Sequence, residues 1–174
     1  MKLRAIIESI QDVTITAIDE EEDWELAEQA EQVARRCQIR ISRDKRLLLI
    51  ALAGDTVVGA VWATFDQDQS YREPVWDGDE PRDEPDVYCF DFDVVVDPQA
   101  RATGAGMVSS NIGPKLIDAA LVEYHQIAAM YGYENTFIRV QVVNPKLARF
   151  LERRYGFESS GGWSPSNPFM EFHG

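Results

Sequence analysis

A run of three valines, Val94-Val95-Val96, constrains the fold of this chain more than any other feature. A continuous apolar run is typical of a strand that is buried on both faces, and Asp97-Pro98 ends it. A glycine-containing loop, residues 101–106, comes next, and apolar side chains then recur at helical spacing from Lys115 to Tyr131. The sequence therefore predicts a buried strand that leads through a glycine loop into a helix.

This strand-loop-helix arrangement is suited to binding an anion. Free backbone N–H groups and the helix dipole favour negative charge there, and Gly104 and Gly106 let a phosphate approach the backbone without a Cβ in the way. Arg101 adds a fixed positive charge with forked donors. The loop lacks the third glycine of a dinucleotide-binding fingerprint, and no Gly-Lys-Ser/Thr follows it as in a P-loop. We therefore expect an anion site of another kind, or else a plain turn between strand and helix.

The remaining elements follow in an order that indicates one central sheet. Residues 13–18 predict an edge strand, and a helix ending near Arg40 follows, with Asp19 and Glu22 as a capping box. Its expected buried stripe is Trp24, Ala27, Ala30, Ala34 and Cys37. The other predicted elements are a short helix at 2–11, a hairpin at 47–53 and 56–65, strands at 87–96, 136–143 and 169–172, and a helix at 145–155. This is a mixed α/β pattern, and residues 1–174 are expected to form a single domain.

Two local features add to this picture. Gly59, inside the second hairpin strand, indicates a bulge or a close approach of another backbone segment. Residues 66–86 hold nine acidic residues and three prolines. We expect them to form an acidic insert without regular structure, which is either functional or disordered.

Charge is distributed unevenly along the chain. The net charge is −13; residues 1–100 hold 24 acidic and 10 basic residues, whereas residues 101–174 hold 6 and 7. An anionic ligand would meet less repulsion in the second part, and nucleic acid is disfavoured because phosphate binding needs clustered lysine and arginine. No run of 18 apolar residues suggests a membrane span, and Cys37 and Cys89 lack metal-ligand spacing. We therefore expect a cytoplasmic protein with no metal site and no membrane or nucleic-acid partner.

Three blocks of the sequence resemble the GNAT superfamily of acetyl-CoA-dependent N-acetyltransferases. Val96 to Gly106 resembles the acetyl-CoA signature, a strand often ending Val-x-Pro and then Arg or Gln-x-x-Gly-x-Gly or Ala. Val142 to Phe157 resembles the next block, a strand and an asparagine followed by a helix that ends in Gly-Phe. Gly54 to Gly59 resembles the turn between the family's paired strands. The likeness extends over roughly residues 13–172.

The resemblance implies an α/β (α+β) fold and a cofactor. The fold is a mixed, mostly antiparallel central sheet of about six or seven strands flanked by helices, with parallel strands splayed at the cofactor site. The cofactor is acetyl-CoA (coenzyme A), whose pantetheine arm would pair with the backbone of Val94, Val95 and Val96. The pyrophosphate would be held by backbone N–H groups of Arg101, Ala102, Thr103, Gly104, Ala105 and Gly106. Asn144 would face the pantetheine or the sulfur; a plain helix N-cap is the alternative.

The resemblance also implies a reaction, the direct attack of a primary amine on the thioester. A base must remove the ammonium proton, and we expect it to be Asp91 or Asp93, which alternate with apolar residues and share one strand face. A merely polar strand face is the alternative. Many family members place a tyrosine four residues before the glycine of Gly-Phe; Glu152 occupies that position here, and Tyr155 directly precedes Gly156. Glu152 and Tyr155 complete the set of catalytic candidates.

The chain departs from the family pattern after the glycine loop. Residues 107–114 stand before the expected start of the helix, so either about seven residues are inserted or the helix is lengthened and broken at Pro114. Ser109, Ser110 and Gly113 would then share the phosphate site. These departures support an alternative, a catalytically degenerate GNAT-fold module that binds CoA or a protein; a third reading is an interaction protein without the cofactor.

The acceptor is expected to be an amine on a small molecule or a protein. The acidic insert at 66–86 lies where the family often builds the acceptor side, so we expect it to favour a cationic acceptor. Surface aromatics such as Trp163 and Phe169 permit a homodimer.

Overall fold

A computed structural model describes residues 13–67, 76–77, 80–81, 88–102, 106–131, 136–142, 145–164 and 167–173. Contacts divide the chain into two compact units, one comprising Met1–Thr64 and Asp93–His125, the other Phe65–Phe92 and Gln126–Gly174. The short helix expected at 2–11 lies outside the described residues.

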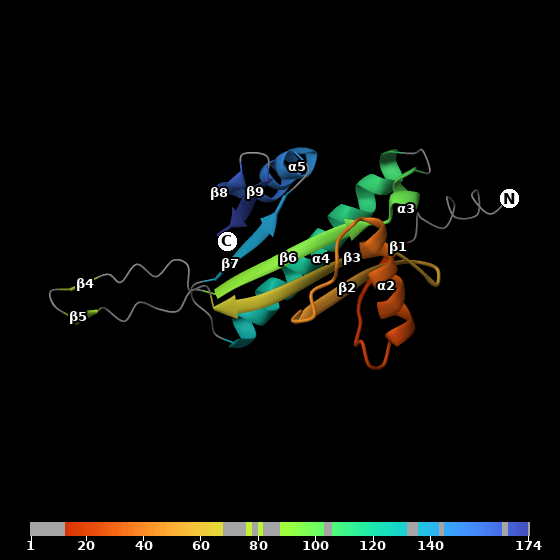
Figure 1. Cartoon of the computed structure of the whole chain (residues 1–174), viewed down its shortest axis with the longest axis horizontal. Helices are drawn as coiled ribbons and strands as arrows, with labels where there is room; N and C mark the ends of the chain where they lie inside the picture. Colours follow the sequence, from red (N-terminus) through yellow and green to blue (C-terminus); the bar gives the residue numbers. More distant parts are fainter. Residues whose placement is uncertain are drawn as a thin grey trace. The chain divides into compact units, whose positions relative to one another are not determined.

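Seven strands form one sheet (Figure 1). They are β1 (Val13–Ala17), β2 (Leu47–Ala53), β3 (Thr56–Gln67), β6 (Tyr88–Val96), β7 (Thr136–Gln141), β8 (Glu158–Ser164) and β9 (Asn167–Phe172), in the order β1-β2-β3-β6-β7-β9-β8. The pairs β1–β2, β2–β3, β7–β9 and β8–β9 are antiparallel, and β6–β7 is parallel. The mixed, mostly antiparallel sheet expected from the sequence is therefore confirmed, with β1 at an edge as predicted.

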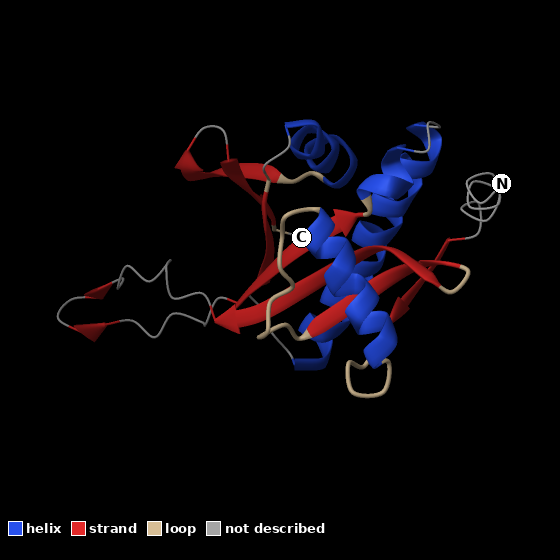
Figure 2. Cartoon of the chain, turned by 45° about the vertical axis from the view of Figure 1, so that its right-hand side comes forward, coloured by secondary structure: helices blue, strands red, loops and turns tan. Residues whose placement is uncertain are grey.

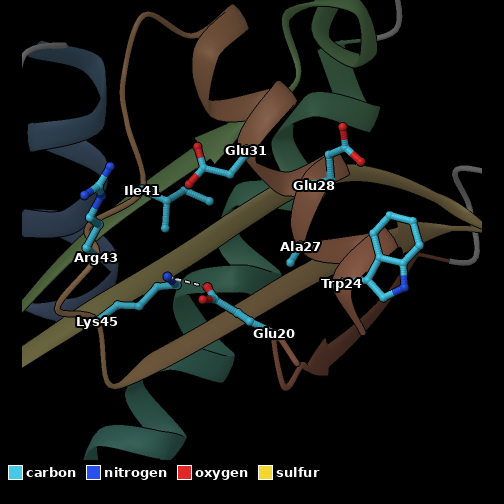
Figure 3. Close-up of a pocket in the computed structure, with 8 residues that line it drawn as sticks. All are labelled: Glu20, Trp24, Ala27, Glu28, Glu31, Ile41, Arg43 and Lys45. Carbon is cyan, nitrogen blue, oxygen red and sulfur yellow. Dashed lines mark ion pairs between the residues drawn. The ribbon is translucent and has the colours of Figure 1, made fainter. Parts of the chain in front are cut away.

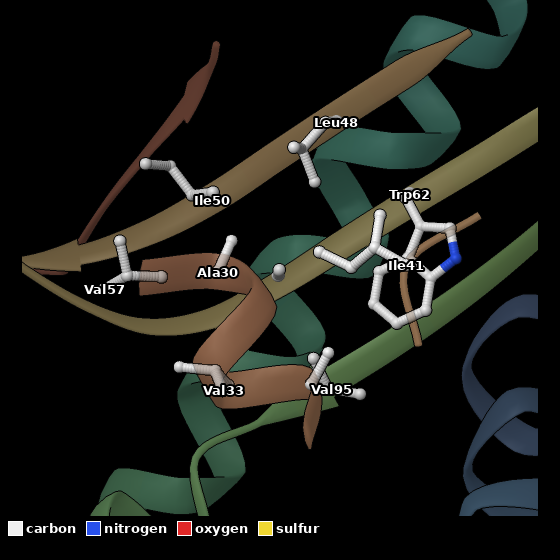
Figure 4. Close-up of a cluster of buried hydrophobic side chains, with 10 residues drawn as sticks. Ala30, Val33, Ile41, Leu48, Ile50, Val57, Trp62 and Val95 are labelled. Carbon is white, nitrogen blue, oxygen red and sulfur yellow. The ribbon is translucent and has the colours of Figure 1, made fainter. Parts of the chain in front are cut away.

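In the first unit, α2 (Trp24–Arg36) and the part of α4 (Gly106–Tyr131) up to His125 lie on opposite faces of β2 and β3 (Figures 1 and 2). Side chains alternate between the two faces of a strand, so Ile50 and its partner Ala60 face α2, as do Leu48 and its partner Trp62. Together with α2 they form the core shown in Figure 4. Its buried members are Ala30, Val33, Ala34, Ile41, Leu48, Ile50, Val57, Ala60, Trp62 and Val95. This core encloses the end of β6, the strand predicted from the valine run.

Gly59 sits where two backbone segments come close together. The β2–β3 register shifts so that Ala51 pairs with Gly59 but Leu52 pairs with Val57, which leaves Val58 as the extra residue of a bulge. A Cβ built on Gly59 would lie 2.9 Å from the carbonyl oxygen of Val95 and 3.1 Å from Cγ2 of Ile112 in α4. Both predicted alternatives, a bulge and a close approach, are therefore present.

The start of α2 differs from the prediction. Asp19 does not cap the helix; its Oδ1 accepts hydrogen bonds from the backbone of Glu21 at 2.8 Å and Glu22 at 3.4 Å, and so closes a turn before it. The helix begins later, with Asp23 as the N-cap residue. Trp24, expected in the buried stripe, is 59% exposed because it is the first helical residue and lies outside the stripe that packs on the sheet.

In the second unit, α5 (Pro145–Tyr155) ends as the sequence predicts. Gly156 has φ +74°, its N–H donates to the carbonyl of Glu152 at 3.0 Å, and the N–H of Phe157 reaches the carbonyl of Leu151 at 3.4 Å. This is an αL C-cap, in which the residue after the helix is left-handed and bonds the carbonyl four residues back, so it favours glycine. Phe157 is buried and packs edge-on against Phe92. The Gly-Phe pair thus has a structural role of its own.

Four other predictions need correction. Residues 66–86 contain a short antiparallel pair, β4 (Trp76–Asp77) and β5 (Glu80–Pro81), so the three prolines do not exclude all regular structure. Strand β8 was not predicted, because Gly161-Gly162 indicates a turn. The helix predicted from Lys115 begins at Gly106, so of the two alternatives for residues 107–114 the lengthened helix is the one present. It continues through Pro114 without the expected break.

Candidate functional site

The carboxyl end of β6 is fixed from two sides. The N–H of Asp97 donates to the carbonyl of Val58 at 2.9 Å, on the β3 side. The carbonyl of Val96 accepts a weak hydrogen bond from Sγ of Cys37, the C-cap residue of α2, at 3.4 Å. Val95 is buried, whereas Val94 and Val96 are half-buried. The valine run is thus held in place by backbone contacts as well as by packing.

Asp97 links this strand end to the next helix. Its Oδ1 accepts from the N–H of Gln99 at 2.9 Å, which caps the short helix α3 (Pro98–Ala102), and Pro98 is suited to the first helical position. Its Oδ2 pairs with Arg36 of α2 at 2.6 Å. The carboxylate is 9% exposed and the guanidinium 40%. One buried side chain therefore ties β6, α3 and α2 together.

Substituting Asp97 with alanine is expected to cost about 2–3 kcal/mol of unfolding free energy, since it removes a helix cap and a charge-assisted hydrogen bond. Arg36→Gln is expected to cost about 1 kcal/mol or less, because Arg36 is partly solvated and the cap remains. Urea unfolding of both variants measures the two losses of unfolding free energy. Equal losses for the two variants would show that the cap contributes nothing.

Helix α4 packs against the same strand end. The nearest atom to a Cβ built on Gly113 is Cγ2 of Val96, at 3.8 Å, so this turn of α4 lies beside β6. The helix starts at Gly106, and its first N–H groups have no intrahelical acceptor. Residues 103–105 and the side chains of 101–111 lie outside the described part of the chain, so the roles expected for the loop remain predictions. The lengthened helix begins immediately after residues 103–105.

The backbone of β6 presents one edge that the described β6–β7 ladder does not use. The carbonyl of Val95 and the N–H of Asp97 point toward β3, so Val94 and Val96 direct their backbone groups to the opposite edge. The parallel register with β7 ends at the pair Asp91–Arg139, although β6 continues to Val96. An extended ligand with amide groups could pair with this edge as an added strand.

Asp91, one of the expected bases, is engaged in an ion pair. Its two carboxylate oxygens accept from Nε and Nη2 of Arg139 at 2.8 and 2.9 Å. The guanidinium also lies 5.3 Å from the ring centre of Phe169 and 6.0 Å from that of Phe137. Asp91 is 44% exposed and Arg139 24%. The pair joins β6 and β7 at the last residue of their ladder, so Asp91 would have to give up this partner to act as a base.

The other catalytic candidates lie on two elements. Asp93 is half-buried in β6. On α5, Glu152 is exposed and Tyr155 is half-buried, with its ring 5.7 Å from Phe150 and under the guanidinium of Arg154 at 5.5 Å. Asn144 lies outside the described residues. The sequence reasoning missed Arg139 and Asp97, because nothing in the local pattern marks an ion-pair partner 48 or 61 residues away.

None of the described helices is both long and apolar enough to span a membrane. Among the described residues, no three His, Cys, Asp or Glu side chains are placed to hold a metal ion.

The sequence matches no protein-family model and no curated protein. The fold, in contrast, matches solved structures over most of the chain. A GNAT-family acetyltransferase from Streptococcus pneumoniae aligns with a TM-score of 0.54 at 13% identity, covering 93% of this chain and 99% of that one. The chain has the GNAT fold.

Two further structures of similar proteins were solved with ligands. Naa50 of Arabidopsis thaliana, in complex with the bisubstrate analogue CoA-Ac-MVNAL, aligns with a TM-score of 0.55 at 14% identity, covering 93% of this chain and 99% of that one. AtaTR bound with AcCoA aligns with a TM-score of 0.56 at 13% identity, covering 94% of each chain. At these identities the likeness establishes the GNAT fold and leaves the reaction to be argued from the site.

Proposed function

We propose that the chain is an acetyl-CoA-dependent N-acetyltransferase that acts on an amine. The observation that carries this proposal is the strand end Val94–Val96, which a GNAT fold positions beside the start of a long helix. Similar proteins of this fold were solved with AcCoA and with a CoA-containing bisubstrate analogue, which supports the same ligand here. The charge distribution is compatible with an anionic cofactor, since net negative charge is confined to residues 1–100.

The residues present fit the two chemical parts of acetyl-CoA. The amide groups of its pantetheine arm match the edge of β6 formed by the backbone of Val94 and Val96. Its pyrophosphate matches the start of α4, whose first N–H groups have no acceptor within the helix, and the glycine-containing segment that links α3 to α4. When bound, acetyl-CoA supplies an activated thioester; the protein supplies alignment and a route for the proton.

Acetyl transfer requires an uncharged amine at the thioester carbon. The nitrogen forms a bond to that carbon, the carbon–sulfur bond breaks, and the CoA thiolate leaves and takes up a proton. One ammonium proton must first pass to a base, directly or through water. Holding the two reactants side by side supplies much of the acceleration.

Asp93 is the residue that we propose as this base. It lies on β6 directly before the proposed pantetheine-binding residues, and it is half-buried. Asp91 extends from the same face of the strand but is held by Arg139 on both oxygens. We propose a structural role for Asp91, which Arg139 holds, and a catalytic role for Asp93, which lies next to Val94 on the strand.

Thiol release from acetyl-CoA, measured with a panel of primary amines, tests the function. We expect amine-dependent release of free CoA and an acetylated product, with cationic amines preferred. Tight binding of acetyl-CoA without turnover for any amine would instead support the alternative of a degenerate GNAT-fold binding module.

A further inference from the structure

A surface cavity of about 360 Å³ lies in the first unit, between α2 and the segment that precedes β2 (Figure 3). Trp24, Ala27, Glu28 and Glu31 line it from α2, and Ile41 lines it from the opposite segment. The volume is at the lower end of the range for small-molecule pockets. Ala27 and Ile41 provide apolar surface, while the two glutamates lie along one wall. The cavity is therefore suited to a small ligand with both charge and apolar surface.

The charged residues of the cavity differ in whether they have partners. Lys45 forms an ion pair with Glu20, and its Nζ also donates to the carbonyl of Ser42 at 3.2 Å. These two lining charges therefore compensate each other. Among the described residues, Glu28 and Glu31 have no hydrogen-bond or ion-pair partner, and Arg43 has none either. Two carboxylates and one guanidinium remain for a ligand, which leaves the cavity with an excess of negative charge.

Trp24 provides a second, independent feature. Its side chain is 59% exposed at the rim of the cavity, one helical turn from Glu28 (Figure 3). An indole face attracts cations, and this one is accessible at the rim of a cavity. An aromatic face beside unpaired carboxylates is the arrangement that recognises an organic ammonium group.

A second hollow of about 290 Å³ adjoins the first. It shares Glu20, Arg43 and Lys45 with it, and adds Asp19 and the edge of β2 around Leu47. The two hollows together extend the space for an elongated chain. Arg46 also lines this second hollow, so its basic side chains outnumber its acidic ones and the ammonium groups are expected in the first cavity.

We propose that this cavity binds a small organic cation that carries primary ammonium groups on an alkyl chain. Both a free polyamine and a lysine side chain have this chemistry. The ammonium group lies between Trp24 and Glu28, a second positive group meets Glu31, and the alkyl chain covers Ala27 and Ile41. This binding stands independently of acyl transfer, since none of these residues belongs to the proposed acetyl-CoA site.

Calorimetric titration with spermidine at low ionic strength, without acetyl-CoA, tests the proposal. We expect saturable binding that weakens with added salt. Glu28→Gln and Glu31→Gln should each raise the Kd about threefold, and the double variant about tenfold. Trp24→Ala should raise it about threefold, and Trp24→Phe less, because a phenyl face keeps part of the attraction.

The chain offers a matched control variant and a variant that should have the opposite effect on the Kd. Glu25 lies on the same helix and is exposed, but it does not line the cavity, so Glu25→Gln removes the same charge elsewhere. We expect it to change the Kd by less than about 1.5-fold. Arg43→Gln should lower the Kd about threefold, because it removes the one unpaired positive charge in the lining.

Four results would overturn the proposal. They are the absence of saturation, an effect of Glu25→Gln as large as that of Glu28→Gln, weaker binding after Arg43→Gln, and equal binding of the neutral chain hexane-1,6-diol. Titrations with spermidine and with Nα-acetyl-lysinamide distinguish the two sources of the ammonium group. Tighter binding of spermidine indicates a free polyamine, and tighter binding of Nα-acetyl-lysinamide indicates a lysine side chain. Since the titration contains no acetyl-CoA, a negative result leaves the proposed acetyltransferase function untouched.

Discussion

Replacing Asp93 with asparagine is expected to lower kcat for acetyl transfer by roughly 10²- to 10⁴-fold, the usual contribution of a general base. The substitution keeps the shape of the side chain and removes its capacity to take up a proton. The KM for acetyl-CoA should change by no more than about twofold, because the proposed cofactor contacts of the neighbouring residues are made by backbone atoms. Steady-state kinetics with the best amine of the panel measures both values.

Asp91→Asn is the matched control, on the same face of the same strand. It weakens a partly exposed ion pair with Arg139, so we expect a stability loss of about 1 kcal/mol or less and a kcat within about threefold of the parent. Added formate should restore part of the rate of Asp93→Ala, whose truncated side chain leaves room for the missing carboxylate, and leave the rate of Asp91→Ala unchanged. If Asp91→Asn loses the larger part of kcat instead, the assignment of the two roles is wrong.

Replacing Gly59 with alanine is expected to reduce the free energy of unfolding by roughly 1–3 kcal/mol, and valine should cost more. A Cβ at this position would lie 2.9 Å from a backbone oxygen, that of Val95, which cannot rotate away. Leu116 and Ile112 close the other sides at 3.0 and 3.1 Å. Urea unfolding should show a lower midpoint with an unchanged slope.

Gly113→Ala supplies the control for this prediction. Its Cβ would meet only Cγ2 of Val96 at 3.8 Å, an ordinary contact, so we expect no loss and a gain of up to about 1 kcal/mol, because alanine is the better helix former. A loss at Gly113 equal to that at Gly59 would mean that general glycine effects, and not the approach of β3 to β6, govern the cost. The same pair also reports on function, because a shift of the Val95 backbone should weaken acetyl-CoA binding only in the Gly59 variant.

The strands and helices that sequence predicted best are those with a strong local signal. The valine run, the hairpin turn at Gly54-Asp55 and the Gly156 cap each leave a pattern that follows from backbone sterics and burial. Where local signals compete with packing, they mislead. Pro114 lies inside α4, and Gly161-Gly162 lies inside β8, because neighbouring elements support a backbone that propensity alone disfavours.

The sequence could predict the backbone parts of the candidate site but not its side-chain contacts. Its backbone parts lie along one stretch of the chain, so the order of strand, loop and helix could indicate them. The contacts of Asp91 with Arg139 and of Asp97 with Arg36 depend on residues distant in sequence. Trp24 has the spacing of a core residue, and only the position of the helix start shows that it is exposed.

Calorimetric titration of the full chain with acetyl-CoA tests the central claim most directly. We expect saturable one-to-one binding with a Kd of roughly 1 µM to 1 mM, and a melting temperature that rises with ligand concentration, since a ligand of the native state must stabilise it. Free CoA should bind comparably, because it carries the same pantetheine arm and pyrophosphate. No detectable heat and no change in melting temperature at millimolar acetyl-CoA would contradict the account.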